Sequence, residues 1–231
     1  MRRILSYLSL IFTTFFLALA ALALAPFDGK GEKVHRIARL WARIGLAAAG
    51  ISASCEGSEQ LLAPPYLLMS NHQSALDIPV LLACVPLSFK FIAKRELFRI
   101  PLFGWAIRKA GYISIDRENP REALKAMEEA VRKIRGGTTV LIFPEGTRSP
   151  DGKLLPFMKG AFFLASRAAV PVVPLAIVGS NPLQPPGRVV PDLRGHVTIH
   201  VGRPISPDGK KGLSSKAELM EEVRRAIEGL M

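Results

Sequence analysis

Short apolar or alternating runs recur along most of the chain, and stretches with helical periodicity separate several of them. The runs at 66–70, 88–94, 111–116, 138–143, 172–178 and 196–201 are typical of strands. Helical patterns cover 77–85, 158–169 and a last segment to Leu230, whose cap we expect at Ser214 or Ser215. This alternation predicts an α/β fold in which a mixed, largely parallel sheet is flanked by helices.

The best-marked helix follows Asn119. Asn119 can cap it, Pro120 takes the first helical position, and Glu122 stands at the spacing of a capping box. Gly136–Gly137 end the segment. Its expected apolar stripe is Ala123, Leu124, Met127, Val131 and Ile134.

The run from Ile4 to Ala25 contains no charged residue. At ~1.5 Å per residue, a helix of this length covers the ~30 Å hydrocarbon core of a bilayer. A cleaved signal peptide is the alternative, because Arg2 and Arg3 precede the run and Ala23–Ala25 resembles a cleavage site. The run is longer than the usual signal-peptide core of ~7–15 residues, which favours a membrane-associated helix.

The next segment, 33–52, predicts a basic amphipathic helix. Its apolar face is Val34, Ile37, Trp41, Ile44, Ala48 and Ile51, and its basic side is Lys33, Arg36, Arg39 and Arg43. Such a helix either lies in the headgroup layer of an anionic phospholipid membrane or packs on a domain with a solvated basic edge. We favour the membrane because the segment follows a membrane-length run. We therefore expect an N-terminal membrane-associated helical pair at 1–54, which anchors a domain at 55–231.

The charge of the chain indicates anionic partners. Its formal net charge is +12. More basic residues follow the first apolar run than precede it, which predicts that the 55–231 domain faces the cytosol at the inner (cytoplasmic) membrane. The sequence leaves open whether the first helix spans the membrane or turns back as a hairpin at Pro26–Gly31. The two cysteines lack CxxC spacing and indicate neither a disulfide framework nor a zinc site.

The stretch "SNHQSALDIPVL" (70–81) places His72 five positions before Asp77. The two side chains can meet only if the chain turns from strand to helix between them, since a regular helix or strand directs them apart. Ser74 can cap the following helix. The ordinary interpretation is that Asp77 completes this cap and that His72 is a core histidine. The chemical interpretation is a general base oriented by a carboxylate; without a G-x-S-x-G elbow, the activated hydroxyl would belong to the substrate.

A second group of candidate residues follows other predicted strands. "LIFPEGTRSPDGK" (141–153) leads from an apolar strand into a loop, in which Arg148 offers a planar fork for phosphate oxygens. The alternative is a surface ion pair of Glu145 with Arg148, which would contribute little. "GYISIDR" (111–117) brings Arg117 to another strand end, and Lys94 and Lys159 stand where they could add charge.

Together these segments resemble the glycerolipid acyltransferase family, specifically the 1-acyl-glycerol-3-phosphate acyltransferases of the bacterial membrane. Four sequence blocks of that family occur in order: "NHQSALD", "GYISIDR", "FPEGTRS" and "VPVVPLAI" (170–177). Pieces between and after them, "FIAKREL", "PLFGWAIRKAG", "PFMKGAF" and "VGRPI", are also similar. The resemblance covers about 62–205 and implies the glycerolipid acyltransferase fold.

The resemblance also implies an activity. It makes His72 the general base and Asp77 its partner, in an attack by the sn-2 hydroxyl of lysophosphatidic acid on the acyl thioester of acyl-CoA or acyl carrier protein (acyl-ACP). The product is phosphatidic acid; no acyl-enzyme, metal or other cofactor is implied. The residues expected to shape the phosphate site are Arg117, Glu145, Gly146, Thr147 and Arg148, with Lys94 and Lys159 nearby.

Other functions stay open on the sequence alone. The same chemistry could act on another acceptor, either glycerol-3-phosphate or a different lysophospholipid. A non-enzymatic basic protein on a membrane surface or nucleic acid would carry its basic residues away from strand ends, which is not the pattern here, so we expect no nucleic-acid partner. A secreted hydrolase would require cleavage after Ala25 and an enzyme nucleophile.

Overall fold

The computed structural model describes residues 2–188, 191–192, 194–207 and 213–231. Its strands form a seven-stranded sheet in the order β1-β7-β6-β2-β5-β3-β4. The strands are β1 (Ile51–Glu56), β2 (Leu67–Ser70), β3 (Phe89–Lys94), β4 (Ile113–Ile115), β5 (Thr139–Ile142), β6 (Val172–Val178) and β7 (Gly195–Val201). The α-helices are α1 (Arg2–Leu24), α2 (Glu32–Ala49), α3 (Asp77–Cys84), α4 (Phe103–Lys109), α5 (Pro120–Arg135), α6 (Lys159–Ala168), α7 (Ser180–Leu183) and α8 (Leu213–Leu230). Short 3-10 helices are η1 (Ala25–Phe27), η2 (Ser58–Gln60) and η3 (Arg95–Arg99).

The sheet is mixed but largely parallel, as the sequence predicts. Strands β2, β3, β4, β5 and β6 pair in parallel, β1 pairs in parallel with β7, and β7 joins β6 antiparallel. The carboxyl ends of β2 to β6 therefore lie at one edge of the sheet, where open α/β sheets usually bind their ligands.

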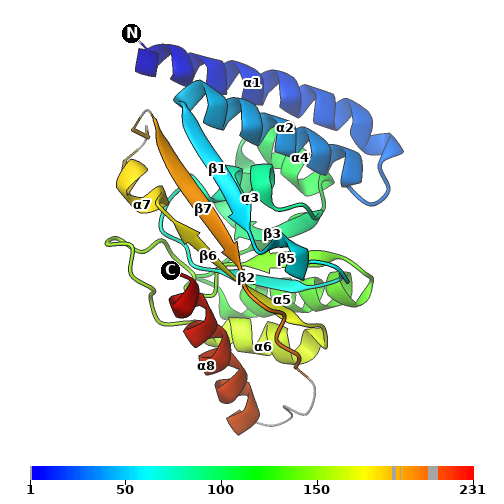
Figure 1. Cartoon of the computed structure of the whole chain (residues 1–231). Coiled ribbons are helices and arrows are strands. Elements are labelled where there is room, and N and C mark those ends of the chain that lie inside the picture. The colour runs from blue at the N-terminus through cyan, green and yellow to red at the C-terminus, as the bar shows by residue number, and fades with distance from the viewer. Residues whose placement is uncertain (1, 189–190, 193, 208–212) are drawn as a thin grey trace.

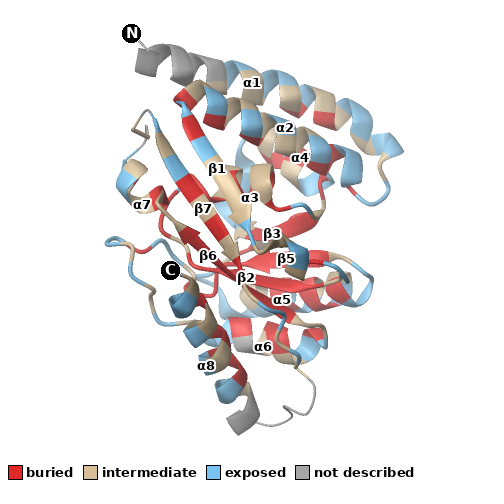
Figure 2. Cartoon of the chain, in the orientation of Figure 1, coloured by how far each residue is buried: buried red, intermediate tan, exposed pale blue. Residues whose placement is uncertain are grey.

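Helices cover both faces of the sheet (Figure 1). Successive residues of β2 point to opposite faces: Leu68 packs in a core with α1 to α4, whereas Leu67 and Met69 pack in a second core with α5, α6 and α8. Figure 2 shows the central strands buried and the outer sides of the helices exposed. A strand buried on both faces explains the continuous apolar sequence of β2.

Helices α1 and α2 form an antiparallel hairpin that lies against the sheet side carrying α3 and α4 (Figure 1). The Trp41 indole N–H on α2 donates to the Thr14 hydroxyl on α1 at 2.8 Å. Between the helices, Gly31 adopts a φ of 71°, and a Cβ there would lie 2.6 Å from the Ala110 carbonyl oxygen, so this close approach to α4 requires glycine. The chain thus turns back within Pro26–Gly31, the segment at which one of the two alternatives from the sequence places a hairpin.

The outer side of α1 is apolar. Within the described residues, one helical segment, Leu10–Phe27, is long and apolar enough to cross a membrane. Its exposed large side chains include Ile11, Phe12, Phe15, Phe16 and Leu19. Contiguous exposed apolar surface of this kind marks an interaction site rather than an ordinary solvated face.

The prediction of a helix over 33–52 is wrong at the C-terminal end of that segment. Helix α2 stops at Ala49, because Gly50 takes a left-handed conformation with φ 67°. Ile51, expected on the helix face, instead begins β1, an edge strand that pairs with β7. Strand β1 crosses the boundary expected between residues 54 and 55.

Two smaller predictions are also corrected. Leu124, expected in the apolar stripe of α5, is 48% exposed, because α5 buries Ala126 and Ala130 beside Met127 and turns Leu124 outward. Ser214 and Ser215, expected as caps, lie within α8, which reaches back to Leu213. The Asn119 cap is confirmed, since its side chain accepts from the N–H groups of Arg121 and Glu122.

Candidate active site

His72 and Asp77 meet at the carboxyl end of β2. The His72 Nδ1 lies 2.7 Å from the Asp77 Oδ2. Between the end of β2 at Ser70 and the start of α3 at Asp77, the chain turns from strand to helix, as the spacing of the two residues requires. The Asp77 side chain is fully buried, whereas that of His72 is 15% exposed. The pair thus has a buried carboxylate behind an imidazole that reaches the surface.

Hydrogen bonds of Ser74 and Asp77 close the turn before α3. The Ser74 hydroxyl accepts from the N–H of Leu76 at 3.1 Å, and Asp77 Oδ2 accepts from the N–H groups of Ser74 at 2.9 Å and Gln73 at 2.8 Å. The prediction that Ser74 caps the helix is wrong, because α3 begins at Asp77 with Leu76 at its N-cap position and no side-chain bond there. The Asp77 oxygen that binds His72 instead also holds the backbone of the turn between the two residues.

The other oxygen of Asp77 is bound by a residue that the sequence did not single out. Ser180, the first residue of α7, donates its hydroxyl to Asp77 Oδ1 at 2.6 Å. Nearby, the side-chain amide of Asn71 donates to the Ile177 carbonyl at 2.9 Å and accepts from the Ile177 N–H at 2.7 Å. Ser180 and Asn71 are buried, so hydrogen bonds to β6 and α7 fix the position of the carboxylate.

The imidazole of His72 is held from a third side by Phe143. The two rings stack with centroids 3.9 Å apart and an interplanar angle of 13°. Phe143 directly follows β5 and begins the "FPEGTRS" block. With Nδ1 bound to Asp77, the Nε2 of His72 is the ring nitrogen left for a ligand; it bonds to no residue in the described part of the chain.

Glu145 connects the two loops of the site. Its Oε1 accepts from the N–H of His72 at 2.6 Å, and its Oε2 accepts from the N–H of Leu155 at 2.8 Å. The residue is only 4% exposed, and this burial raises the pKa of Glu145 to about 7 against the lowering effect of the two hydrogen bonds. Both oxygens are thus directed to backbone groups, and the carboxylate supports the loop that carries His72.

Arg117 reaches the "FPEGTRS" loop from the end of β4. Its guanidinium donates to the carbonyl of Gly146. Gly146 has a φ of 72°, and a side chain there would overlap the sulfur of Met158. This glycine lets the loop pass beneath Met158 and turn its carbonyl toward Arg117.

The remaining predicted residues lie at the surface. Thr147 and Arg148 are exposed, and within the described residues no carboxylate pairs with Arg148, so the alternative Glu145–Arg148 ion pair does not form. Lys94 lies 3.6 Å from Glu96, with a side chain that is 52% exposed. Lys159 is exposed at the first residue of α6. The structure therefore connects His72, Asp77 and Glu145 closely and leaves these four residues accessible.

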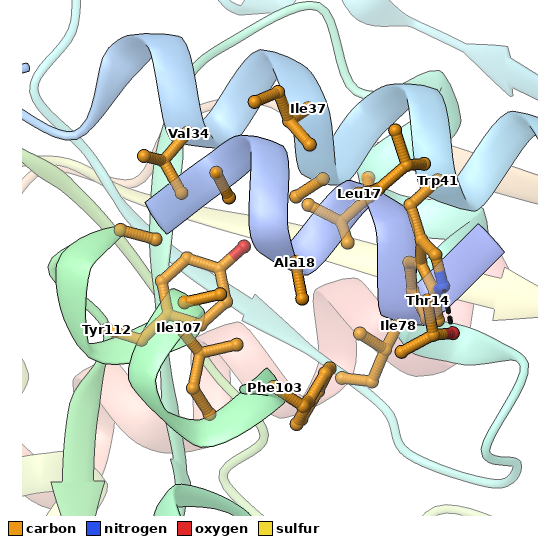
Figure 3. A pocket seen from close by; sticks show the side chains of 15 residues that line it. Thr14, Leu17, Ala18, Val34, Ile37, Trp41, Ile78, Phe103, Ile107 and Tyr112 are labelled. Carbon is orange, nitrogen blue, oxygen red and sulfur yellow. Dashed lines mark hydrogen bonds between the residues drawn. The ribbon is translucent and has the colours of Figure 1, made fainter. Parts of the chain in front are cut away.

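An apolar pocket lies beneath the helical hairpin, between α1, α2, α3 and α4 (Figure 3). Ile78, which follows Asp77 in α3, lines it, as do Ala18, Val34 and Phe103. The hydroxyl of Tyr112 is directed into it and has no hydrogen-bond partner among the residues that the structure describes (Figure 3). The pocket thus borders the helix that begins at the candidate carboxylate.

Comparisons with known proteins agree with this fold. Residues 52–178 match the family described as Acyltransferase. The matched segment runs from within β1 to the end of β6 and includes the loops that carry His72 and Glu145. The chain belongs to the acyltransferase family. A solved relative, the 1-acyl-sn-glycerophosphate (LPA) acyltransferase PlsC from Thermotoga maritima, superposes with a TM-score of 0.78 at 30% identity, covering 100% of this chain and 98% of that chain.

Curated relatives have similar names. The chain is 38% identical over 205 residues to the chloroplastic 1-acyl-sn-glycerol-3-phosphate acyltransferase BAT2 of Brassica napus, covering 87% of this chain and 57% of that protein. The chloroplastic LPAT1 of Arabidopsis thaliana is 38% identical over 78% of this chain and 51% of its own length. The chain therefore spans little more than half the length of these plant relatives. It covers 69% of the 1-acyl-sn-glycerol-3-phosphate acyltransferase of Saccharomyces cerevisiae at 32% identity.

Proposed function

We propose that this protein transfers an acyl group from an acyl thioester to the sn-2 hydroxyl of lysophosphatidic acid and so forms phosphatidic acid. The observation that carries the proposal is the bond of His72 Nδ1 to the buried Asp77 carboxylate, at the carboxyl edge of the sheet and within the segment that matches the family. The names of the relatives support the same acceptor and reaction.

In this mechanism Asp77 fixes the tautomer of His72. The Nδ1–H group of His72 donates a hydrogen bond to the carboxylate, which leaves the lone pair of Nε2 to take the proton of the acceptor hydroxyl. The acceptor oxygen attacks the thioester carbonyl, and the tetrahedral intermediate collapses with loss of the thiolate, which takes the proton from His72. Asp77 stabilises the transient imidazolium. The route uses no acyl-enzyme, metal or cofactor, and acyl-CoA or acyl-ACP enters as the co-substrate.

The phosphate of the acceptor is proposed to bind on the "FPEGTRS" side of the site. Arg148 and Arg117 offer forks that match phosphate oxygens, and Thr147 offers a hydroxyl. Gly146 and Glu145 shape the loop, the latter through its bonds to His72 and Leu155. Lys94 and Lys159 add positive charge near a dianionic substrate.

The hairpin is proposed to hold the site at a membrane surface. The exposed apolar side of α1 suits the interface of an anionic phospholipid membrane, where both acceptor and product reside. In this arrangement residues 1–54 anchor the catalytic acyltransferase domain, 55–231, on the cytosolic face of the inner membrane. The apolar pocket beside α3 offers an acyl chain an environment free of water.

The test is acyl transfer by the purified full-length protein in phospholipid vesicles. Lysophosphatidic acid, glycerol-3-phosphate and lysophosphatidylcholine are compared as acceptors, each with a series of acyl-CoA and acyl-ACP donors. We expect the highest kcat/KM with lysophosphatidic acid. A preference for either other acceptor would replace the proposed substrate, and no turnover with any pair would reject the activity.

A further inference from the structure

Arg224 on the C-terminal helix α8 binds the loop that follows the "FPEGTRS" block. Its guanidinium donates to two successive carbonyls, that of Leu155 at 2.9 Å and that of Leu154 at 3.3 Å. The same group lies 2.9 Å from Glu228 and 5.6 Å from the ring centre of Phe157. Arg224 lies outside the segment 52–178 that matches the family, so no family motif assigns it a role.

One of the two peptides that Arg224 binds, the Leu154–Leu155 peptide, also binds Glu145. The N–H of Leu155 donates to Glu145 Oε2 at 2.8 Å, while Glu145 Oε1 accepts from the N–H of His72 at 2.6 Å. Four groups thus form a continuous series of hydrogen bonds, from the guanidinium of α8 through the Leu155 peptide and Glu145 to the backbone of the candidate base. Ser149 closes the same loop by donating its N–H to the His72 carbonyl at 2.7 Å.

The carboxylate form of Glu145 suits this series best. Each of its oxygens accepts from an N–H donor, and protonation would remove the negative charge that strengthens both bonds. Burial raises the pKa of Glu145 to about 7, and the charge of Asp77 on α3 acts in the same direction. The positive charge of Arg224 on α8 lowers the pKa of Glu145. Two other titratable groups lie near this pair: the imidazole of His72, whose backbone N–H binds Glu145, and the carboxylate of Glu228, which binds Arg224. Among the residues that the structure describes, Arg224 is thus the cation whose charge favours the ionised form of Glu145.

We infer that Arg224 is a positioning residue of the proposed acyl transfer: it fixes the Leu154–Leu155 peptides and keeps Glu145 ionised, so that Glu145 holds the backbone of His72 in the catalytic geometry. The inference rests on the proposed function for its kinetic readout. Arg224 touches neither His72 nor Asp77 and acts on the base only through the intervening peptide and carboxylate.

The test compares Arg224→Met, which keeps an unbranched side chain, with Arg225→Met at the exposed neighbouring position. The rate of acyl transfer to lysophosphatidic acid by full-length protein in vesicles is measured from pH 5.5 to 9. In Arg224→Met we expect the acid limb of the kcat profile to move upward by roughly half a pH unit or more, with KM for the acceptor unchanged. Arg224→Lys should recover part of the shift, and Arg225→Met should match the wild-type protein.

A double-mutant cycle with Glu145→Gln separates this role from simple anchoring of α8. If Arg224 acts through Glu145, the factor by which Arg224→Met lowers kcat near pH 6.5 shrinks in the Glu145→Gln background. An equal factor in both backgrounds, or an unshifted acid limb in Arg224→Met, would overturn the inference. Circular dichroism and the thermal unfolding midpoint show whether each variant is folded.

A measurement independent of activity distinguishes failure of this inference from failure of the proposed function. The carboxyl ¹³C resonance of Glu145 is titrated in micelles in the wild-type and Arg224→Met proteins. The inference predicts a higher pKa of Glu145 in the variant, whatever the acceptor proves to be. An unchanged pKa contradicts it even if the wild-type enzyme acylates lysophosphatidic acid.

Discussion

The two halves of the candidate site differ in how many hydrogen bonds their charged side chains make within the protein. In the half that carries His72 and Asp77, the carboxylate accepts from the imidazole, two backbone N–H groups and the Ser180 hydroxyl. In the half that carries Arg148, the guanidinium is exposed and pairs with no described residue. If His72 is the base, it is therefore already oriented in the free protein, whereas the proposed phosphate site around Arg148 is held by fewer contacts. Changes in the first half should affect the rate of chemistry and stability, and changes in the second half should affect binding.

The largest effect is expected from Asp77→Asn. An amide places N–H against at least one of the donors that now point to the carboxylate, and it no longer stabilises the imidazolium. We expect kcat to fall by roughly 10⁴-fold, as for other histidine bases that lose their carboxylate. Glu122→Gln, which alters an exposed pair with Lys125, is the control and should be nearly neutral. A kcat within tenfold of wild type would remove Asp77 from the mechanism.

Arg148→Met should give the opposite kinetic pattern. Loss of a charge-assisted phosphate contact costs about 1.5–3 kcal/mol, which corresponds to roughly a 10- to 100-fold rise in KM for lysophosphatidic acid. The KM for the acyl donor and the thermal unfolding midpoint should stay near wild type. Arg132→Met, at an exposed position of α5, controls for the loss of one positive charge. An unchanged acceptor KM would show that the phosphate binds elsewhere.

The pH dependence of stability offers a third contrast. The pKa of Glu145 is raised in the folded protein to about 7, above the 4.5 of an unperturbed glutamate. The folded state thus binds this proton more tightly, so the associated stability is full below pH 4.5 and is lost as the pH rises through about 7. Compared with Glu145→Gln, the wild-type protein should lose about 3 kcal/mol of unfolding free energy over that interval. Urea unfolding at several pH values measures this difference, and parallel curves for the two proteins would refute it.

The smallest effect is expected from Ser180→Ala. This change removes one of four donors to Asp77 and leaves the bond to His72 in place. A loss of about 1 kcal/mol of stability and a decrease in kcat of about fivefold should follow. Ser166→Ala, whose hydroxyl bonds only a carbonyl within α6, serves as the matched control. If Ser180→Ala were as damaging as Asp77→Asn, the carboxylate would not be preorganised in the way described.

The difference between the two halves also explains what the sequence could predict. His72 and Asp77 are near neighbours in the chain, so their spacing alone shows that the chain must turn from strand to helix if the two side chains are to meet. Ser180 and Arg224 reach the site from distant segments, and only the order of strands in the sheet brings them there. Local patterns carry no such information. Strand β1 was not predicted for a related reason. Its small, half-buried residues have no strong strand pattern of their own, and they form a strand because they pair with β7.

Glu145 illustrates a further difference between a motif and its geometry. The resemblance to the glycerolipid acyltransferases implied that Glu145 helps to shape the phosphate site, and both of its oxygens bind backbone N–H groups. A motif identifies which residues matter, whereas only the packed loop shows whether a side chain faces the ligand or supports the residue that does. The same distinction applies to Gly146, whose missing side chain makes room for Met158.

The central claim, that His72 is the general base, is tested most directly by purified His72→Ala in vesicles with lysophosphatidic acid and acyl-CoA. The account predicts that phosphatidic acid formation falls by a factor of about 10³ or more, while the protein keeps its fold and still binds vesicles. Turnover within about tenfold of wild type by the folded variant would contradict it.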